Sequence, residues 1–149
     1  MEAVIFIGLQ AAGKSTFYRE RFIATHVRIN LDMLKTRHRE RRFLQTCIET
    51  RQPFVVDNTN PTRAERQVYI ETAKQTGFRV IGYYFQSKVE DCKRRNEQRP
   101  AHERIPLAGL LGAAARMQIP SMDEGFDELH YVRIDENSQF VVEEWQDEV

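Results

Sequence analysis

The sequence lacks the segments that direct a chain into or across a membrane. Its first 20 residues contain no basic stretch followed by a long apolar core, and no run reaches 18 apolar residues. Secretory signal peptides need the first pattern, and membrane-spanning helices need the second. The sequence therefore predicts neither a signal peptide nor a membrane contact, and we expect a cytoplasmic protein.

Cysteine is scarce as well. The two cysteines, Cys47 and Cys92, have no CxxC partner and no nearby histidine pairing. Disulfide frameworks and zinc sites need more cysteines or fixed Cys and His spacings, so we expect two reduced packing residues. Stability must then come from a hydrophobic core. A single domain over residues 1–149 is long enough to bury roughly 68–70% of its unfolded surface.

A net charge is also missing, because 22 Lys and Arg balance 22 Asp and Glu. The balance hides an asymmetry: residues 121–149 contain ten acidic residues and one arginine. Subtraction from the totals leaves 21 basic and 12 acidic residues in 1–120, an excess of nine. This asymmetry suggests a polyanionic partner held by a short contact, while the acidic C-terminal segment is most simply a solubilising surface.

One motif stands out in this composition. Residues 8–15 read "GLQAAGKS", which is the spacing G-x-x-x-x-G-K-S, between a strand predicted at 2–7 and a helix predicted from Lys14. In this strand–loop–helix context the spacing is typical of a phosphate-binding P-loop, whose backbone N–H groups and helix N-terminus attract an anion. We therefore expect the following residues to bind a nucleotide: Gly8, Leu9, Gln10, Ala11, Ala12, Gly13, Lys14, Ser15 and Thr16.

The same motif predicts the cofactors. Lys14 would reach the β- and γ-phosphates, and Ser15 would offer its hydroxyl to Mg²⁺. Asp57 ends the apolar segment 53–57, as a Walker-B-like carboxylate does, and would orient Mg²⁺ through water. The sequence thus predicts ATP and Mg²⁺, with Ser15 and Asp57 as the residues at the metal.

The remaining pattern alternates between strands and helices. Apolar runs predict strands at 2–7, 26–30, 53–57, 78–85, 129–135 and 140–145, and helical spacing predicts helices at 14–25, 31–51, 61–77, 88–99 and 107–117. This alternation favours an α/β fold, a parallel sheet with helices on both faces. Ligands in such sheets bind at the carboxyl ends of strands, where Gly8, Asp32 and residues 57–60 are expected.

These segments together resemble the P-loop 5′-polynucleotide kinases, a family that includes the phage end-healing enzyme and the kinase half of the animal 3′-phosphatase/5′-kinase repair proteins. The resemblance extends over "GLQAAGKSTF", "INLD", "PFVVDNTNPTRAERQVYIETAKQTGF", "KRRNEQR" and "PSMDEGFDELHYV". It implies the P-loop kinase fold and transfer of the γ-phosphate of ATP to the 5′-hydroxyl end of DNA or RNA. No D-x-D-x-T phosphatase signature occurs in the sequence, so only the kinase half is implied.

By this resemblance Asp32 matches the general base that takes the proton from the 5′-hydroxyl. A carboxylate suits this role because it is ionised at neutral pH, although Asp32 could instead merely decorate a helix N-terminus capped by Asn30. Lys35 matches a family arginine that holds the acceptor's phosphate. Lysine offers a point charge there and not a bidentate fork.

Arg95 and Arg99 match the lid arginines that the family places over the ATP phosphates, where with Lys14 they would stabilise the transferring group. Their i,i+4 spacing also fits a solvated helix face with ion pairs. Asn58 and Thr59 are expected near the phosphates and the substrate, or in a polar turn that satisfies its own backbone.

Other functions stay open from the residues alone. A kinase for a nucleoside or a sugar would keep the phosphate-binding residues, and a non-catalytic nucleotide-binding module would need Lys14 but not Asp32. The basic segment 35–42 fits nucleic-acid contact and an exposed helix surface equally well. The sequence does not specify the oligomeric state.

Overall fold

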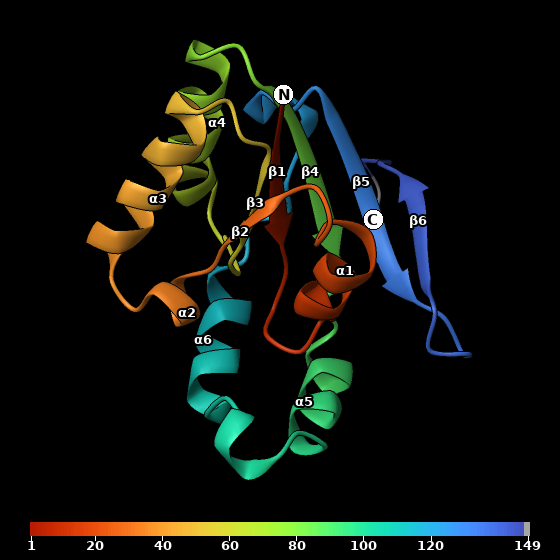
Figure 1. The fold of residues 1–149 in the computed structure, drawn as a ribbon. Coiled ribbons are helices and arrows are strands. Elements are labelled where there is room, and N and C mark those ends of the chain that lie inside the picture. Colours follow the sequence, from red (N-terminus) through yellow and green to blue (C-terminus); the bar gives the residue numbers. More distant parts are fainter. Residues whose placement is uncertain (148–149) are drawn as a thin grey trace.

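The computed structural model describes residues 1–147, which form a six-stranded sheet with the order β2-β3-β1-β4-β5-β6 (Figure 1). The strands are β1 (Glu2–Ile7), β2 (Val27–Ile29), β3 (Phe54–Asp57), β4 (Arg79–Phe85), β5 (Glu128–Ile134) and β6 (Phe140–Glu144). The first five are parallel to their neighbours, and β6 is antiparallel to β5. The last strand reverses because a tight turn joins it to β5, with the Asp135 N–H donating to the Gln139 carbonyl at 2.8 Å.

Helices cover both faces of this sheet, as the alternating pattern predicts. They are α1 (Lys14–Arg21), α2 (Leu31–Leu34), α3 (Arg37–Glu49), α4 (Arg63–Gln75), α5 (Val89–Glu97) and α6 (Leu107–Arg116), with 3-10 turns η1 (Ala101–Glu103) and η2 (Met122–Glu124). Alternate residues of β1 face opposite sides, as a strand requires. Ile5 joins the core beneath α3 and α4, whereas Phe6 joins the core with Phe17 of α1 and Leu110 of α6. The predicted α/β fold class is confirmed.

One predicted helix is broken in two in the structure, and another ends well before the sequence pattern predicts. The helix expected over 31–51 breaks into α2 and α3, because Lys35 has a φ of +75° and Thr36 caps α3 by accepting from the Arg39 N–H at 3.1 Å. A left-handed residue cannot continue a right-handed helix. The helix expected over 14–25 ends at Arg21, where the Phe22 ring leaves the helix to pack on Phe6.

The carboxyl ends of the parallel strands meet at one end of the molecule, the lower end in Figure 1. There the Gly8 N–H donates to the Thr59 carbonyl at 3.1 Å, and the Asn60 side chain donates to the Phe6 carbonyl at 2.8 Å. Gly8 has to be glycine, because an added Cβ would lie 2.9 Å from the Phe85 Cβ. These contacts fix the loop after β1 against the loop after β3.

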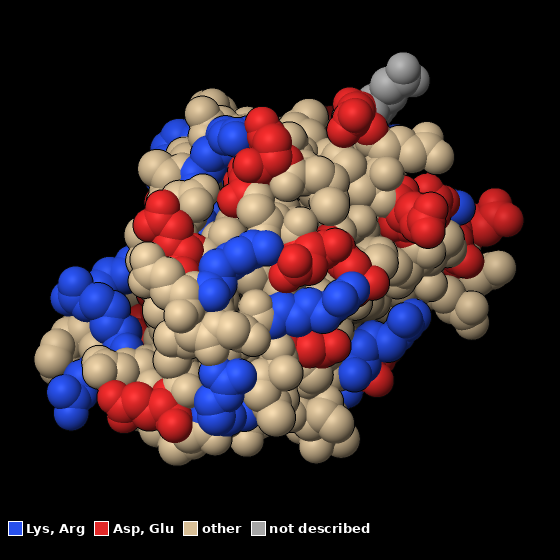
Figure 2. Space-filling view, turned by 90° about the horizontal axis from the view of Figure 1, so that it is seen from above, with Lys and Arg blue, Asp and Glu red and all other residues tan. Residues whose placement is uncertain are grey.

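The opposite end shows how charge is distributed (Figure 2). Basic side chains lie along the left edge, on the side of α3, and acidic side chains gather on the right, where β5 and β6 lie. The acidic segment predicted at 121–149 includes this pair of strands, apart from residues 148–149, which lie outside the described part. None of the helices in residues 1–147 is long and apolar enough to cross a bilayer.

Candidate active site

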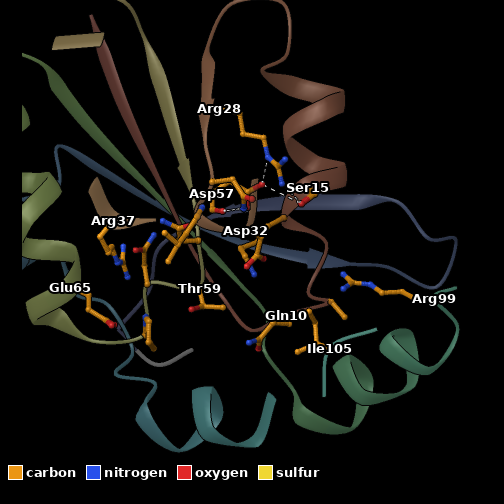
Figure 3. Close-up of a pocket in the computed structure, with 17 residues that line it drawn as sticks. Gln10, Ser15, Arg28, Asp32, Arg37, Asp57, Thr59, Glu65, Arg99 and Ile105 are labelled. Carbon is orange, nitrogen blue, oxygen red and sulfur yellow. Dashed lines mark hydrogen bonds and ion pairs between the residues drawn. The ribbon is translucent and has the colours of Figure 1, made fainter. Parts of the chain in front are cut away.

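A cavity of about 390 Å³ opens at the carboxyl ends of β1, β2 and β3 (Figure 3). Its wall combines the P-loop, α2, the loop after β3 and the region between α5 and α6, three of which the sequence placed at this edge. The lining residues are Gln10, Ala11, Lys14, Ser15, Arg28, Asn30, Leu31, Asp32, Arg37, Asp57, Asn58, Thr59, Asn60, Pro61, Glu65, Arg99 and Ile105.

Lys14 lies at the base of the P-loop with its ammonium group enclosed. Its Nζ donates to the carbonyls of Gly8 at 2.8 Å and Leu9 at 2.6 Å, and the residue is only 9% exposed. This burial lowers the pKa of Lys14 to about 8, against the opposing effect of the Asp57 carboxylate. The charged form of a lysine desolvated in this way is stabilised when a further negative charge comes to lie beside it.

Ser15, in the first turn of α1, and Asp57, at the end of β3, lie next to each other. The Ser15 hydroxyl donates to Asp57 Oδ2 at 3.3 Å, and the carboxylate is 2% exposed. Arg28 of β2 joins them, donating from Nε to Asp57 Oδ2 at 2.8 Å and from Nη2 to Ser15 Oγ at 2.9 Å. A hydroxyl and a carboxylate that already share one cation are a donor set that fits Mg²⁺.

The described residues contain no group of three or more His, Cys, Asp and Glu side chains that could hold a metal ion. In nucleotide enzymes, Mg²⁺ is commonly bound by one or two protein oxygens together with substrate phosphates.

The first turn of α2 presents Asp32 to the cavity, as Figure 3 shows. Asn30 caps this helix: its Oδ1 accepts from the Met33 N–H at 2.9 Å and its Nδ2 donates to the Asp57 carbonyl at 2.6 Å. Asn30 therefore performs the capping, and the Asp32 carboxylate is exposed, with no hydrogen bond or ion pair to the residues that the structure describes.

A buried carboxylate behind the cavity fixes the position of α2. Glu40 accepts from the Tyr69 hydroxyl at 2.7 Å, from Arg37 Nη1 at 2.9 Å and from Asn58 Nδ2 at 2.9 Å. Asn58 in turn accepts from the Leu31 N–H at 2.8 Å. Burial and the adjacent Glu40 carboxylate raise the pKa of Tyr69. The network thus links α3, α4 and the loop after β3 to the helix that carries Asp32.

The structure does not bring every predicted residue to this cavity. Lys35 follows α2 with a positive φ and lines neither this cavity nor the one described next, whereas Arg37, two residues later, lines this one. Arg37, Arg28 and Glu40 were not singled out from the sequence. Arg37 was visible only as a member of the basic segment 35–42, and no local pattern distinguishes Arg28 or Glu40.

A second cavity, of about 590 Å³, lies on the other side of the P-loop. Ala11 and Arg99 line both cavities, so the two are neighbours across the loop. Arg95 donates to the Ala11 carbonyl at 3.5 Å, and the turn between β5 and β6 forms the facing wall. The lining residues are Ala11, Gly13, Thr16, Glu20, Arg94, Arg95, Gln98, Arg99, Ile134, Asp135, Glu136, Ser138 and Phe140.

Two curated relatives are similar to this chain over most of its length. A bifunctional polynucleotide phosphatase/kinase of Schizosaccharomyces pombe is 27% identical over 135 residues, which are 88% of this chain and 33% of the relative. A putative bifunctional polynucleotide phosphatase/kinase of Acanthamoeba polyphaga mimivirus is 25% identical over 138 residues, with the same coverage. The chain therefore spans about a third of the length of these relatives. They confirm the resemblance to P-loop polynucleotide kinases.

Solved structures share the fold at lower identity. Kti12 of Chaetomium thermophilum, in complex with ADP-AlF3, has a TM-score of 0.68 at 16% identity, covering 91% of this chain and 92% of that one. A gluconokinase of Sinorhizobium meliloti 1021 has a TM-score of 0.63 at 16% identity, covering 91% of this chain and 83% of that one.

The family model AAA_33, described as "AAA domain", matches residues 4–120. The match covers more than half of this chain, and the chain therefore belongs to that AAA domain family.

Proposed function

We propose that the chain is an ATP-dependent kinase that transfers the γ-phosphate to the 5′-hydroxyl end of a nucleic acid. The observation that carries the proposal is that Lys14, Asp32 and Arg37 line one cavity. They would supply a phosphate-binding cation, a proton acceptor and a second cation on the acceptor side. The names of the two curated relatives support the same chemistry.

The donor nucleotide would bind around the P-loop. The backbone N–H groups of the loop and the N-terminus of α1 would hold the phosphates, with Lys14 at the β- and γ-phosphates. The nucleoside would extend into the second cavity, which continues from the P-loop past Ala11 and Thr16. Arg95, which lines the second cavity, and Arg99, which lines both, would offset the negative charge that develops on the transferring group.

Ser15 and Asp57 would hold Mg²⁺, which when bound supplies positive charge to the phosphate oxygens. The protein's own part is to keep both oxygens in place. The end of β3 positions Asp57, whose backbone carbonyl accepts a hydrogen bond from Asn30. The first turn of α1 positions Ser15.

On the acceptor side, Asp32 would accept the proton of the attacking hydroxyl as the new oxygen–phosphorus bond forms. Its side chain is free of competing hydrogen bonds among the described residues, so an incoming hydroxyl has access to it. Arg37 would bind the phosphate on the 3′ side of the acceptor nucleotide. Its side chain is 55% exposed but is held in place by Glu40 and Tyr69, so its guanidinium is preorganised.

A kinase for a small hydroxyl compound is the second candidate, because the gluconokinase shares the fold. That enzyme would use Lys14 and Asp32 in the same way but would have no phosphate for Arg37 to bind. A non-catalytic nucleotide-binding module would need neither Asp32 nor Arg37.

The deciding experiment compares kcat/KM for a nucleoside, its 3′-monophosphate, a short 5′-hydroxyl oligonucleotide and a long one, at two salt concentrations. We expect the nucleoside to be poor and oligonucleotides of about three or four nucleotides to approach long ones, with a salt slope near −0.7 for each phosphate neutralised. A bare nucleoside as the best substrate, with no salt effect, would replace this proposal with the small-molecule kinase.

Arg37→Gln tests the acceptor contact. It should remove most of the preference for the 3′-monophosphate over the nucleoside while leaving the nucleoside's own kcat/KM nearly unchanged. Arg41→Gln is the matched control, because Arg41 lies one turn further along α3 and lines neither cavity. Equal effects of the two substitutions would remove Arg37 from the acceptor site.

A second pair of variants tests the general base. Lys14→Ala should weaken ATP binding, whereas Asp32→Asn should leave ATP binding intact and abolish transfer, because Asp32 is needed only when a proton leaves the acceptor. An equal loss of ATP affinity in both variants would contradict the assignment of Asp32.

A further inference from the structure

Arg28 donates hydrogen bonds to Ser15 and Asp57, the two residues that the sequence predicts at the metal. Its guanidinium bridges Asp57 Oδ2, at 2.8 Å, and Ser15 Oγ, at 2.9 Å, and the three side chains close a ring of hydrogen bonds in the cavity wall (Figure 3). Asp57 is 2% exposed, and Arg28 is its direct ion-pair partner. Lys14, the other nearby cation, donates instead to two backbone carbonyls.

The guanidinium and a divalent cation cannot both use this pair at full strength. Arg28 Nε donates to the Asp57 oxygen that also accepts from Ser15, and Nη2 donates to a lone pair of the Ser15 hydroxyl oxygen. A second cation at the same two oxygens would lie a few ångströms from the first, where like charges repel strongly because this carboxylate is shielded from water. Metal binding there therefore requires Arg28 to release at least the Ser15 hydroxyl.

The position of Arg28 allows its guanidinium to move away from Ser15 and Asp57. Arg28 belongs to β2, a three-residue strand at the edge of the sheet that pairs, among the described strands, with β3 alone. Its side chain is 27% exposed, and its guanidinium lies 6.0 Å from the centre of the Tyr18 ring, at the cavity wall. A long stem at a sheet edge can swing its charged end into water while the backbone stays in place.

We infer that Arg28 is a tethered cation that competes with Mg²⁺ for Ser15 and Asp57, and so sets the metal concentration at which the nucleotide binds. In this role Arg28 keeps the buried Asp57 carboxylate paired and makes metal entry depend on its displacement. The inference rests on the metal site of the proposed function but not on its acceptor.

The test measures how a non-hydrolysable ATP analogue binds to the full chain as Mg²⁺ is titrated, by calorimetry. Arg28→Gln removes the charge and keeps a polar side chain of similar reach. The half-saturating Mg²⁺ concentration should fall about three- to tenfold, the effect of removing one partly buried ion pair. Arg79→Gln is the control, since Arg79 pairs with Glu128 at the far end of β4 and should leave the Mg²⁺ dependence unchanged.

Thermal unfolding gives a readout that does not depend on nucleotide. Without added metal, Arg28→Gln should have a lower Tm than the parent protein, because Asp57 loses its partner, and added Mg²⁺ should raise the Tm of the variant more than that of the parent. In an Asp57→Asn background, Arg28→Gln should no longer change the Mg²⁺ dependence. Arg28→Lys, which keeps a cation without the bidentate fork, should shift the Mg²⁺ dependence by a smaller factor and serves as the test if Arg28→Gln does not fold.

The outcomes separate this inference from the proposed function. If analogue binding to the parent protein does not depend on a divalent cation, the proposed metal site itself fails. If the parent needs Mg²⁺ but Arg28→Gln and Arg28→Lys need the same or a higher concentration, Arg28 assists metal binding or plays no part in it, and only the inference is overturned.

Discussion

The buried Lys14 ammonium should make nucleotide binding depend on pH. Its pKa is lowered from its usual 10.5 to about 8, chiefly by burial, so at pH 9 the free protein holds this group roughly 90% deprotonated. A triphosphate favours the charged form and should return the pKa toward 10.5. Binding at pH 9 should therefore take up about 0.9 proton, against about 0.1 at pH 7.

The same linkage sets the size of the effect on affinity. With a pKa of about 8 free and about 10.5 bound, the affinity should fall about tenfold between pH 7 and pH 9, or roughly 1.4 kcal/mol. The stability of the free protein should change in the opposite direction. Because the folded-state pKa is the lower one, the unfolded chain binds more protons between about pH 8 and 10.5, and the free energy of unfolding rises with pH across that window.

Calorimetry with the non-hydrolysable ATP analogue and Mg²⁺, in two buffers of different ionisation enthalpy, measures both the affinity and the protons exchanged. Lys14→Arg is the control for any binding that it retains, because a guanidinium stays protonated over this range and should show no such exchange. Equal affinities at pH 7 and pH 9 with no proton uptake in the parent protein would refute the reasoning, since Lys14 would then be protonated at pH 9 before the nucleotide arrives.

Three further predictions concern stability. Arg66→Met should lower the free energy of unfolding by about 3–5 kcal/mol in urea titrations, because it leaves the buried Glu124 without its 2.7 Å partner, and a Glu124→Leu change in the same chain should recover part of the loss. Glu40→Gln should lower the free energy of unfolding by about 1–3 kcal/mol and raise the KM for the oligonucleotide more than that for ATP. The reason is that three side chains donate to this carboxylate and would no longer have a charged acceptor. Gly82→Ala should lower the free energy of unfolding, measured by urea titration, by about 1–3 kcal/mol, since the new Cβ would lie 2.7 Å from a core aromatic ring. Gly112→Ala, on the open face of α6, should raise the free energy of unfolding in the same assay by up to about 1 kcal/mol.

The parts of the site that follow from the sequence are those carried by local patterns. The P-loop was predictable because its glycine spacing, the preceding strand and the following helix all lie within residues 2–21. Asp32 and Asp57 are predicted at the same edge of the sheet because Asp32 follows a short extended segment and Asp57 ends one, and parallel strands bring their carboxyl ends together. The cavity in the structure joins these three stretches.

The residues that hold those parts in position could not be found in the same way. Glu40 reads as one acid in a basic helix, and its burial depends on Tyr69 and Asn58, which lie 29 and 18 residues away in the chain. Arg28 reads as a polar residue in a weak strand, and its pairing with Ser15 and Asp57 depends on the order of β2, β3 and β1 in the sheet. Contacts of this kind are set by the three-dimensional arrangement and leave no periodic or motif signal.

The break between α2 and α3 determines which basic side chain lines the cavity together with Asp32. In an unbroken helix, Lys35 would lie one turn after Asp32 and share its face, which is the geometry that the family resemblance implies. The positive φ at Lys35 turns the chain instead, and Thr36 starts a new helix whose first residue, Arg37, reaches the cavity and is held by Glu40. In the proposed function, this preorganised, fork-shaped guanidinium takes the part that the family resemblance assigns to Lys35. The proposed function therefore expects that substitution of Arg37, and not of Lys35, changes the preference for the acceptor.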